Sequence, residues 1–195
     1  MKAKLGLVFL ISAFLTLPVF AAENAAMDPA KMAEAKKMGA PGENHKKFES
    51  LVGNWTNTST RKMTPDAAPM TSTGTNTNKM ILGGRFLQQD FKGEAMGEAF
   101  EGTGISGYDN VKKEFTSIWM DNMMTGIMVS TGQYDASSNA ITEKGTFSCP
   151  MTGEKDKEFR SVWKIIDENN YTYEMYGKGP DGHEFKNMEI VYKRQ

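Results

Sequence analysis

The sequence predicts an all-β protein, an antiparallel barrel of about ten up-and-down strands preceded by a short helical lid. From residue 54 onward, Thr, Val, Ile and aromatic residues alternate with polar ones in segments of roughly eight to ten residues. Turns rich in Asp, Asn and Gly separate these segments, and no helical pattern lies between them. An open sheet of this size would leave exposed edges, which closure into a barrel removes.

The first 21 residues have the pattern of a secretory signal peptide. Lys2 and Lys4 precede an apolar run from Leu5 to Leu15, and Val19 and Ala21 suit cleavage after residue 21. The apolar run is too short to span a bilayer. We therefore expect a periplasmic or secreted protein without membrane insertion, with 195 − 21 = 174 residues after cleavage. That length suits one domain.

The charge and the cysteine content exclude several classes of protein. Cleavage would change the formal charge from 23 − 24 = −1 to 21 − 24 = −3. A mildly acidic chain without basic blocks does not have the charge pattern of a nucleic-acid-binding protein. Cys149 is the only cysteine, so no internal disulfide is possible and packing alone must hold the fold.

Two short helical segments are expected before the strands. Residues 22–42 read as a tether with a short helix, which Asp28 begins and Gly39 ends. A further helical turn or two is expected over 43–53, where Phe48 shares an apolar face with the leucine and valine that follow it. This second segment is the predicted lid, and the barrel domain covers 43–195.

Ten strands are expected to follow the lid. Their ranges are 54–62, 71–80, 84–92, 99–108, 114–121, 126–134, 139–148, 157–167, 171–178 and 184–193. In the fourth strand, Gly102, Gly104 and Ser106 share a face with two aromatic residues. Small residues on one face allow a barrel wall to bend or another group to approach closely.

The entry into the first strand resembles a known barrel signature. Gly53-Asn54-Trp55 follows a short helix, as the Gly-x-Trp motif does in the calycins, which include lipocalins and fatty-acid-binding proteins. In those families the Trp packs across the barrel bottom beneath a basic residue of the last strand. The resemblance implies that role for Trp55, with Arg194 (or Lys193) as the basic partner.

A longer resemblance covers nearly all of the chain from His45 onward. The segments that carry it are APMTSTGTNTNKMILGGRFLQQDFKG, FEGTGISGYDN, WMDNMMTG and GPDGHEFKNMEI. They are similar to motifs of an exported bacterial family, the domain-of-unknown-function family fifteen-seventy-nine. This resemblance implies a calycin-like fold and supplies no activity. Cys149 and His183 depart from the residue types usual in that family, so neither is expected to carry a family-wide function.

No catalytic constellation stands out, and we expect a protein that is not an enzyme and needs no cofactor. The two histidines, His45 and His183, lie in the lid and in a turn, and no Gly-x-Ser-x-Gly elbow is present. Glu101 and Asp121 could form a carboxylate pair, but carboxylates at strand ends are usually solvated. No zinc-type spacing is present, and His183 as a haem ligand is an alternative that its place beside a turn disfavours.

The segment WMDNMMTGIM, residues 119–128, leaves three interpretations open. Its methionines fill gaps in a core, line a cavity for an apolar ligand, or bind Cu(I) through their thioethers. The copper interpretation is the weakest, since no His is close in sequence.

The expected function is non-enzymatic binding of a small apolar or amphipathic ligand in the barrel. By alternation, Arg85 shares the face of Leu87 and Gln89, where it, or a tyrosine, could fix the polar end of a ligand. A surface position for Arg85 is the alternative that the pattern leaves equally open. The other candidate lining residues are Tyr108, Trp119, Met120, Met124, Met128, Trp163, Tyr173 and Met175. The alternative is a barrel with a filled core that acts through its surface as an envelope or stress-related interaction protein.

Overall fold

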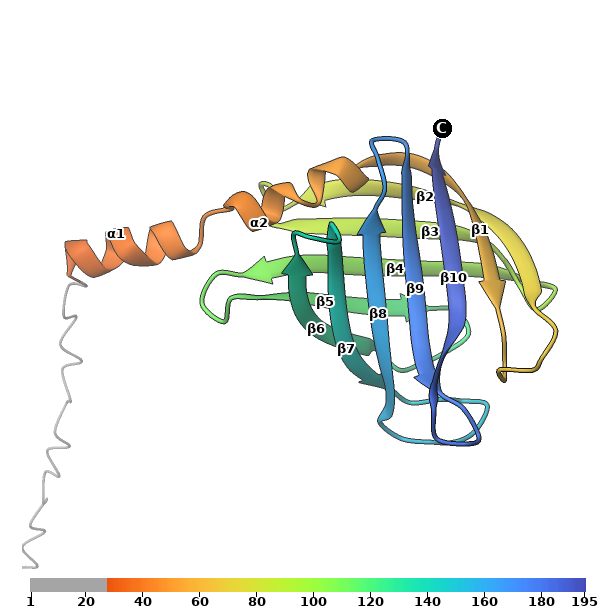
Figure 1. Ribbon diagram of the computed structural model, residues 1–195. Coiled ribbons are helices and arrows are strands. Elements are labelled where there is room, and N and C mark those ends of the chain that lie inside the picture. Colours follow the sequence, from red (N-terminus) through yellow and green to blue (C-terminus); the bar gives the residue numbers. More distant parts are fainter. Residues whose placement is uncertain (1–27) are drawn as a thin grey trace, which may run out of the picture.

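Ten antiparallel strands form one closed barrel, which confirms the predicted fold class (Figure 1). The computed structural model describes residues 28–195, so the predicted signal peptide lies outside the described residues. Every strand pairs with its neighbours in the chain, and β1 pairs with β10 to close the barrel. The strands are β1 (Gly53–Arg61), β2 (Met70–Ile81), β3 (Phe86–Ala95), β4 (Glu98–Asp109), β5 (Glu114–Asp121), β6 (Met128–Asp135), β7 (Ala140–Phe147), β8 (Lys157–Ile165), β9 (Asn170–Lys178) and β10 (Glu184–Arg194).

The first helix, α1 (Pro29–Met38), extends away from the barrel (Figure 1). Asp28 caps it by accepting a hydrogen bond from the Ala30 amide at 2.9 Å, and Gly39 follows its last residue. None of its residues is buried. The side-chain amide of Asn110 donates to two carbonyls at the end of this helix and so ties it to the barrel. No described helix is both long and apolar enough to cross a membrane.

The second helical segment closes one end of the barrel. It consists of α2 (Glu43–Lys46) and the 3-10 turn η1 (Glu49–Leu51). Phe48 and Leu51 are buried and pack on the aromatic residues that fill this end. We call these buried residues the floor cluster: Phe48, Leu51, Trp55, Leu87, Phe115, Ile141, Tyr171 and Tyr192.

Trp55 and Arg194 lock the helical segment to the barrel. The Trp55 indole N–H donates to the Leu51 carbonyl at 2.9 Å, and its ring meets Tyr171 edge-on at 4.7 Å. The Arg194 guanidinium stacks on the Trp55 ring at 4.1 Å and donates to three backbone carbonyls, two of which precede β1. Gly53 has a φ of 131°, and a side chain there would meet Arg194.

The walls at β6 and β7 approach so closely that glycine is required. Gly132 faces the interior, and a methyl group on it would overlap the Thr142 carbonyl oxygen of the neighbouring strand. Because backbone atoms cannot move aside cheaply, we expect Gly132→Ala to lower the free energy of unfolding by about 1–3 kcal/mol or more in urea titrations. Gly126→Ala is the matched control, since nothing lies within 4 Å of its added methyl group. Equal stability of the two variants would contradict this account of the wall.

Candidate functional site

A belt of buried polar side chains crosses the interior of the barrel. Inward-facing positions of eight consecutive strands, β1 to β8, supply it. Its members, which we call the polar belt, are Asn57, Asn76, Asn78, Gln89, Ser106, Ser117, Ser130, Glu143 and Ser161, all buried except the half-buried Ser117. Strand register places several of them directly opposite one another, as in Ser106 with Ser117 and Glu143 with Ser161. The middle of this barrel is therefore polar, which the sequence analysis did not predict.

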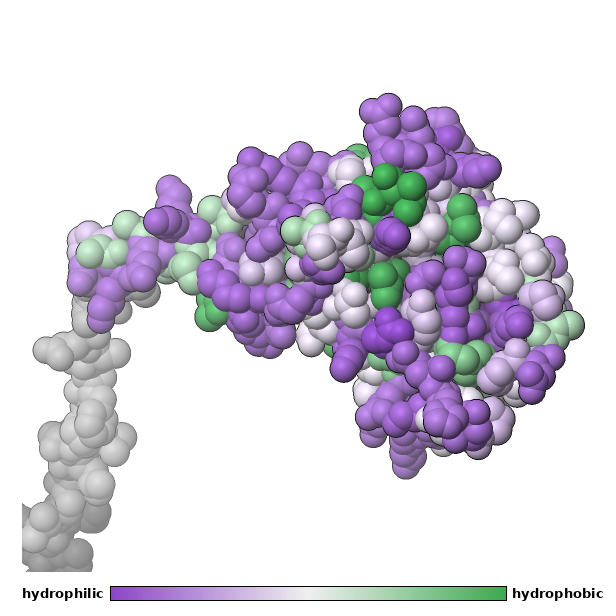
Figure 2. All heavy atoms as spheres, in the orientation of Figure 1, coloured by the Kyte–Doolittle hydropathy of each residue, from purple (hydrophilic) through white to green (hydrophobic). Residues whose placement is uncertain are grey.

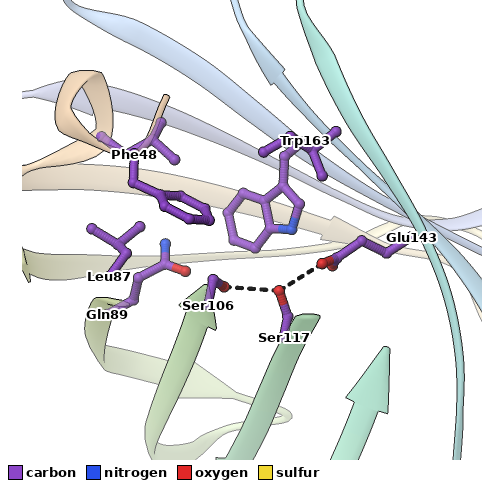
Figure 3. A pocket seen from close by; sticks show the side chains of 9 residues that line it. Phe48, Leu87, Gln89, Ser106, Ser117, Glu143 and Trp163 are labelled. Carbon is purple, nitrogen blue, oxygen red and sulfur yellow. Dashed lines mark hydrogen bonds between the residues drawn. The ribbon is translucent and has the colours of Figure 1, made fainter. Parts of the chain in front are cut away.

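Glu143 is the only carboxyl group within the polar belt, and it is 2 % exposed. Its two oxygens accept hydrogen bonds from Ser117 Oγ at 2.7 Å and from Ser130 Oγ at 3.1 Å. The Ser117 hydroxyl also shares a hydrogen bond of 2.8 Å with Ser106 Oγ (Figure 3). Burial raises the pKa of the Glu143 carboxyl, and the hydrogen bonds from Ser117 and Ser130 only partly oppose that shift. The shift favours the protonated form of the carboxyl, which can both donate and accept a hydrogen bond.

A small enclosed cavity lies beside this carboxyl. Its volume is about 10 Å³, which is the space needed for a single water molecule. Gln89, Ser106, Ser117 and Glu143 form its polar side, and Trp163 with the floor cluster forms its apolar side (Figure 3). This part of the barrel is thus almost filled by its own side chains.

Two amide oxygens of the polar belt have no hydrogen-bond donor among the described residues. They are Oδ1 of Asn57 and Oδ1 of Asn78, in residues that are 4 % and 2 % exposed. The amide nitrogens of both are satisfied, by Asn76 in one case and by Leu51 and Tyr171 in the other. Unpaired buried acceptors are rare and costly in folded proteins. They show that the belt has hydrogen-bonding capacity that this fold does not use.

The opposite end of the barrel is open and apolar. Here the inward-facing side chains, which we call the mouth cluster, are Phe91, Phe100, Trp119, Met128, Phe147, Phe159, Met175 and Met188. Five of these, including Phe100, Trp119 and Met128, are half-buried rather than buried, so solvent reaches them. Trp119 lies flat against the wall, because a side chain at Gly102 or Gly104 would overlap its ring. The barrel interior therefore changes from apolar floor to polar belt to apolar mouth.

The outer surface of the barrel has fewer features of a binding site than the interior. The face shown in Figure 2 is mostly hydrophilic, with apolar residues in small separated groups. A surface cleft of about 590 Å³ lies between the loops of the open end, but its charged residues largely pair with one another. Lys157 lies 3.2 Å from Glu154, and Lys178 lies 2.8 Å from Glu158.

Six of the predicted lining residues face the interior. Trp119, Met128 and Met175 belong to the mouth cluster, while Trp163 and Tyr173 lie between the mouth and the floor, 4.5 Å apart between ring centroids. Tyr108 is inside the barrel but at its closed end, where it packs against Phe115 and His45.

The placement of Arg85 inside the barrel was wrong. Its side chain is exposed and donates to the carbonyls of Gly39 and Leu82, outside the barrel. Leu82 and the two glycines after it have positive φ, so the alternation of β3 does not extend back through this turn.

The methionines of 119–128 do not gather at one point. Met120 neighbours the inward-facing Trp119 and so lies on the outer face of β5, whereas Met128 faces inward. Met124 lies in the loop between the two strands, at the open end. The copper interpretation needed converging thioethers, and this arrangement separates them. Among the tryptophan and methionines of residues 119–128, only Trp119 and Met128 face the interior and can line a cavity.

The histidines and the predicted carboxylate pair are also separated. His183 is exposed in the turn between β9 and β10, and buried His45 accepts a hydrogen bond from the Gly42 amide at the closed end. Glu101 is exposed, while Asp121 accepts a hydrogen bond from the Trp119 indole at 2.8 Å. Within residues 28–195, no three His, Cys, Asp or Glu side chains gather as metal ligands would.

Comparisons with known proteins give a family and a fold. A search of curated proteins found no match. Among solved structures, the crystal structure of Rv2717c from M. tuberculosis is similar with a TM-score of 0.60 and 15% identity, covering 80% of this chain and 99% of that one. A redesigned β-barrel is similar with a TM-score of 0.39 and 15% identity, covering 77% of this chain and 96% of that one. The model of the family described as "Protein of unknown function (DUF1579)" matches residues 40–194, and the chain belongs to this family.

Proposed function

We propose that this protein is a non-enzymatic, calycin-like carrier that binds a small amphipathic molecule through the open end of its barrel, outside the cytoplasm. The observation that carries the proposal is the polar belt. A barrel interior that served stability alone would gain from apolar side chains at these positions, because buried polar groups cost free energy unless they are paired. The unpaired oxygens of Asn57 and Asn78 and the buried carboxyl of Glu143 instead suit a polar guest.

The closed end is unsuited to entry. Four hydrogen bonds from Trp55, Asn78 and Arg194 to the carbonyls of residues 50–52 hold the lid segment in place. The mouth cluster at the other end is half-exposed and apolar, as the entrance of a site for an amphipathic molecule would be. The signal-peptide pattern of residues 1–21 supports a place outside the cytoplasm.

One observation favours a second function. The enclosed cavity of about 10 Å³ is too small for any organic ligand, so the closed half of the barrel is filled. A barrel that is filled throughout would act through its surface, as an envelope or stress-related interaction protein. The two proposals differ in whether the open half accepts a guest.

Native mass spectrometry separates the two proposals. The protein is purified gently from the exported fraction of its own host, and its mass is compared before and after denaturation. We expect an excess mass that corresponds to a small organic molecule and is lost on denaturation, on a chain that begins after Ala21. The bare polypeptide mass in every preparation would instead support the filled barrel. A chain that retains residues 1–21 would overturn the proposed export.

A further inference from the structure

Arg61, at the end of β1, was not among the site residues predicted from the sequence. Alternation from Trp55 through Asn57 and Ser59 places it on the interior face, in the layer nearest the open end. Its guanidinium donates to Met188 Sδ at 3.5 Å, and Met188 lies opposite the buried Met175 on the interior of the wall. Arg61 therefore belongs to the mouth of the barrel and is half-buried there.

Arg61 differs from the other three arginines of the chain in its partners. Arg160 forms a two-pronged ion pair with Glu184, with N···O distances of 3.0 and 2.6 Å. Arg85 donates to two backbone carbonyls and Arg194 to three. Arg61 has no oxygen acceptor among the described residues, only the thioether of Met188, which is a weak one. Most of its five N–H donors thus have no acceptor among the described residues.

No carboxylate among the described residues pairs with the Arg61 guanidinium within 4.0 Å. Deeper in the barrel, the Glu143 carboxyl accepts hydrogen bonds from two serine hydroxyls of the polar belt and forms no ion pair within 4.0 Å among residues 28–195. On β5, the inward-facing Asp121 accepts a hydrogen bond from Trp119 and forms no ion pair within 4.0 Å among the described residues.

We propose that Arg61 is the binding group for an oxyanion, so that the guest of the barrel is an amphipathic organic acid. The planar guanidinium matches a carboxylate or sulfonate with two parallel hydrogen bonds, which are strong when they are partly buried. The apolar part of the guest packs on the mouth cluster, whose Met188 pairs with Arg61 and whose Met175 lies one strand further round the barrel. This inference rests on the proposed function and specifies the class of its ligand. It assigns to Arg61 the role that the sequence analysis had given to Arg85.

Two fluorescent probes with the same rings test the inference. 8-Anilinonaphthalene-1-sulfonate carries an anion, and N-phenyl-1-naphthylamine is neutral. We expect wild-type protein to bind both saturably. Arg61→Gln should lower the affinity for the anionic probe about tenfold or more, as expected for the loss of one charge-assisted pair. The affinity for the neutral probe should stay within about twofold of the wild-type value. Arg61→Lys keeps the charge but loses the planar guanidinium. Its affinity for the anionic probe should lie between those of wild type and Arg61→Gln.

The control is Arg160→Gln, which removes the same charge from the outer wall and should change neither affinity. Thermal unfolding by circular dichroism establishes that each variant is folded, and Arg61→Lys provides a second test if Arg61→Gln is not. Equal weakening of the anionic probe by Arg160→Gln, or unchanged binding in both Arg61 variants, would overturn the role of Arg61 and leave the proposed function standing. Absence of saturable binding of either probe to the wild type would count against the proposed function itself.

Discussion

Replacing Trp55 with alanine is expected to lower the free energy of unfolding by about 3–5 kcal/mol, as the loss of large buried aromatic side chains does. Trp55 is 1 % exposed and touches three parts of the closed end at once. It packs edge-on against Tyr171, lies under the Arg194 guanidinium and holds the Leu51 carbonyl. The variant loses all three contacts, and the cavity left behind cannot collapse between rigid strands. Urea unfolding followed by far-UV circular dichroism measures the effect.

Trp119→Ala is the matched control, because it removes the same side chain from the open end. Trp119 is half-buried and contacts Phe100 at 6.4 Å between ring centroids. We expect its loss to cost clearly less than that of Trp55. If both variants unfolded at the same urea concentration, the closed end would not be the main source of stability.

The carboxyl of Glu143 is expected to make the protein less stable as the pH rises above about 4.5, its ordinary pKa. Below that pH, folded and unfolded chains both hold the proton. Above it the unfolded chain loses the proton while the folded chain keeps it, because burial raises the folded pKa. The free energy of unfolding then falls by about 1.4 kcal/mol per pH unit until the folded pKa is reached.

Glu143→Gln tests this prediction, because glutamine has nearly the same shape and does not titrate. Its hydrogen bonds can be kept, since the hydroxyls of Ser117 and Ser130 can rotate to donate or accept. We expect the stability of the variant relative to wild type to increase in urea titrations as the pH rises above about 5, until the folded pKa of Glu143 is reached. The exposed Glu101→Gln is the control and should show no such trend. Parallel pH profiles for wild type and Glu143→Gln would mean that Glu143 is ionised in the folded protein.

The sequence contained enough information for the fold but only part of what was needed for the site. In β1 and β2, threonines alternate with asparagines and serines, so both faces are polar and the pattern does not say which one is buried. Trp55 indicates which face of β1 is buried, because a large aromatic residue marks the inward-facing positions. Counting in twos from it leads to Asn57 and then to Arg61, and the same count from Ile141 in β7 leads to Glu143.

Arg85 shows the limit of such counting. The alternation of β3 was extended back across a turn, where positive φ angles change the direction of the chain. The same count works only within an uninterrupted strand. Met120 illustrates a different limit, since a large apolar residue on the outer face of a strand looks the same in the sequence as one inside.

The pairing of Trp55 with Arg194 followed from the resemblance to the calycins. By itself, the sequence determined the number of strands and their approximate ends. These features depend on neighbouring residues, namely on alternation and on turn chemistry. Short sequence patterns therefore predict them. Only the tertiary structure decided that nine polar side chains from eight strands meet in one belt and that Arg61, alone among the arginines, lacks an oxygen acceptor within residues 28–195. Those features depend on strand register and barrel closure, which bring together residues far apart in the chain, and no local pattern records such meetings.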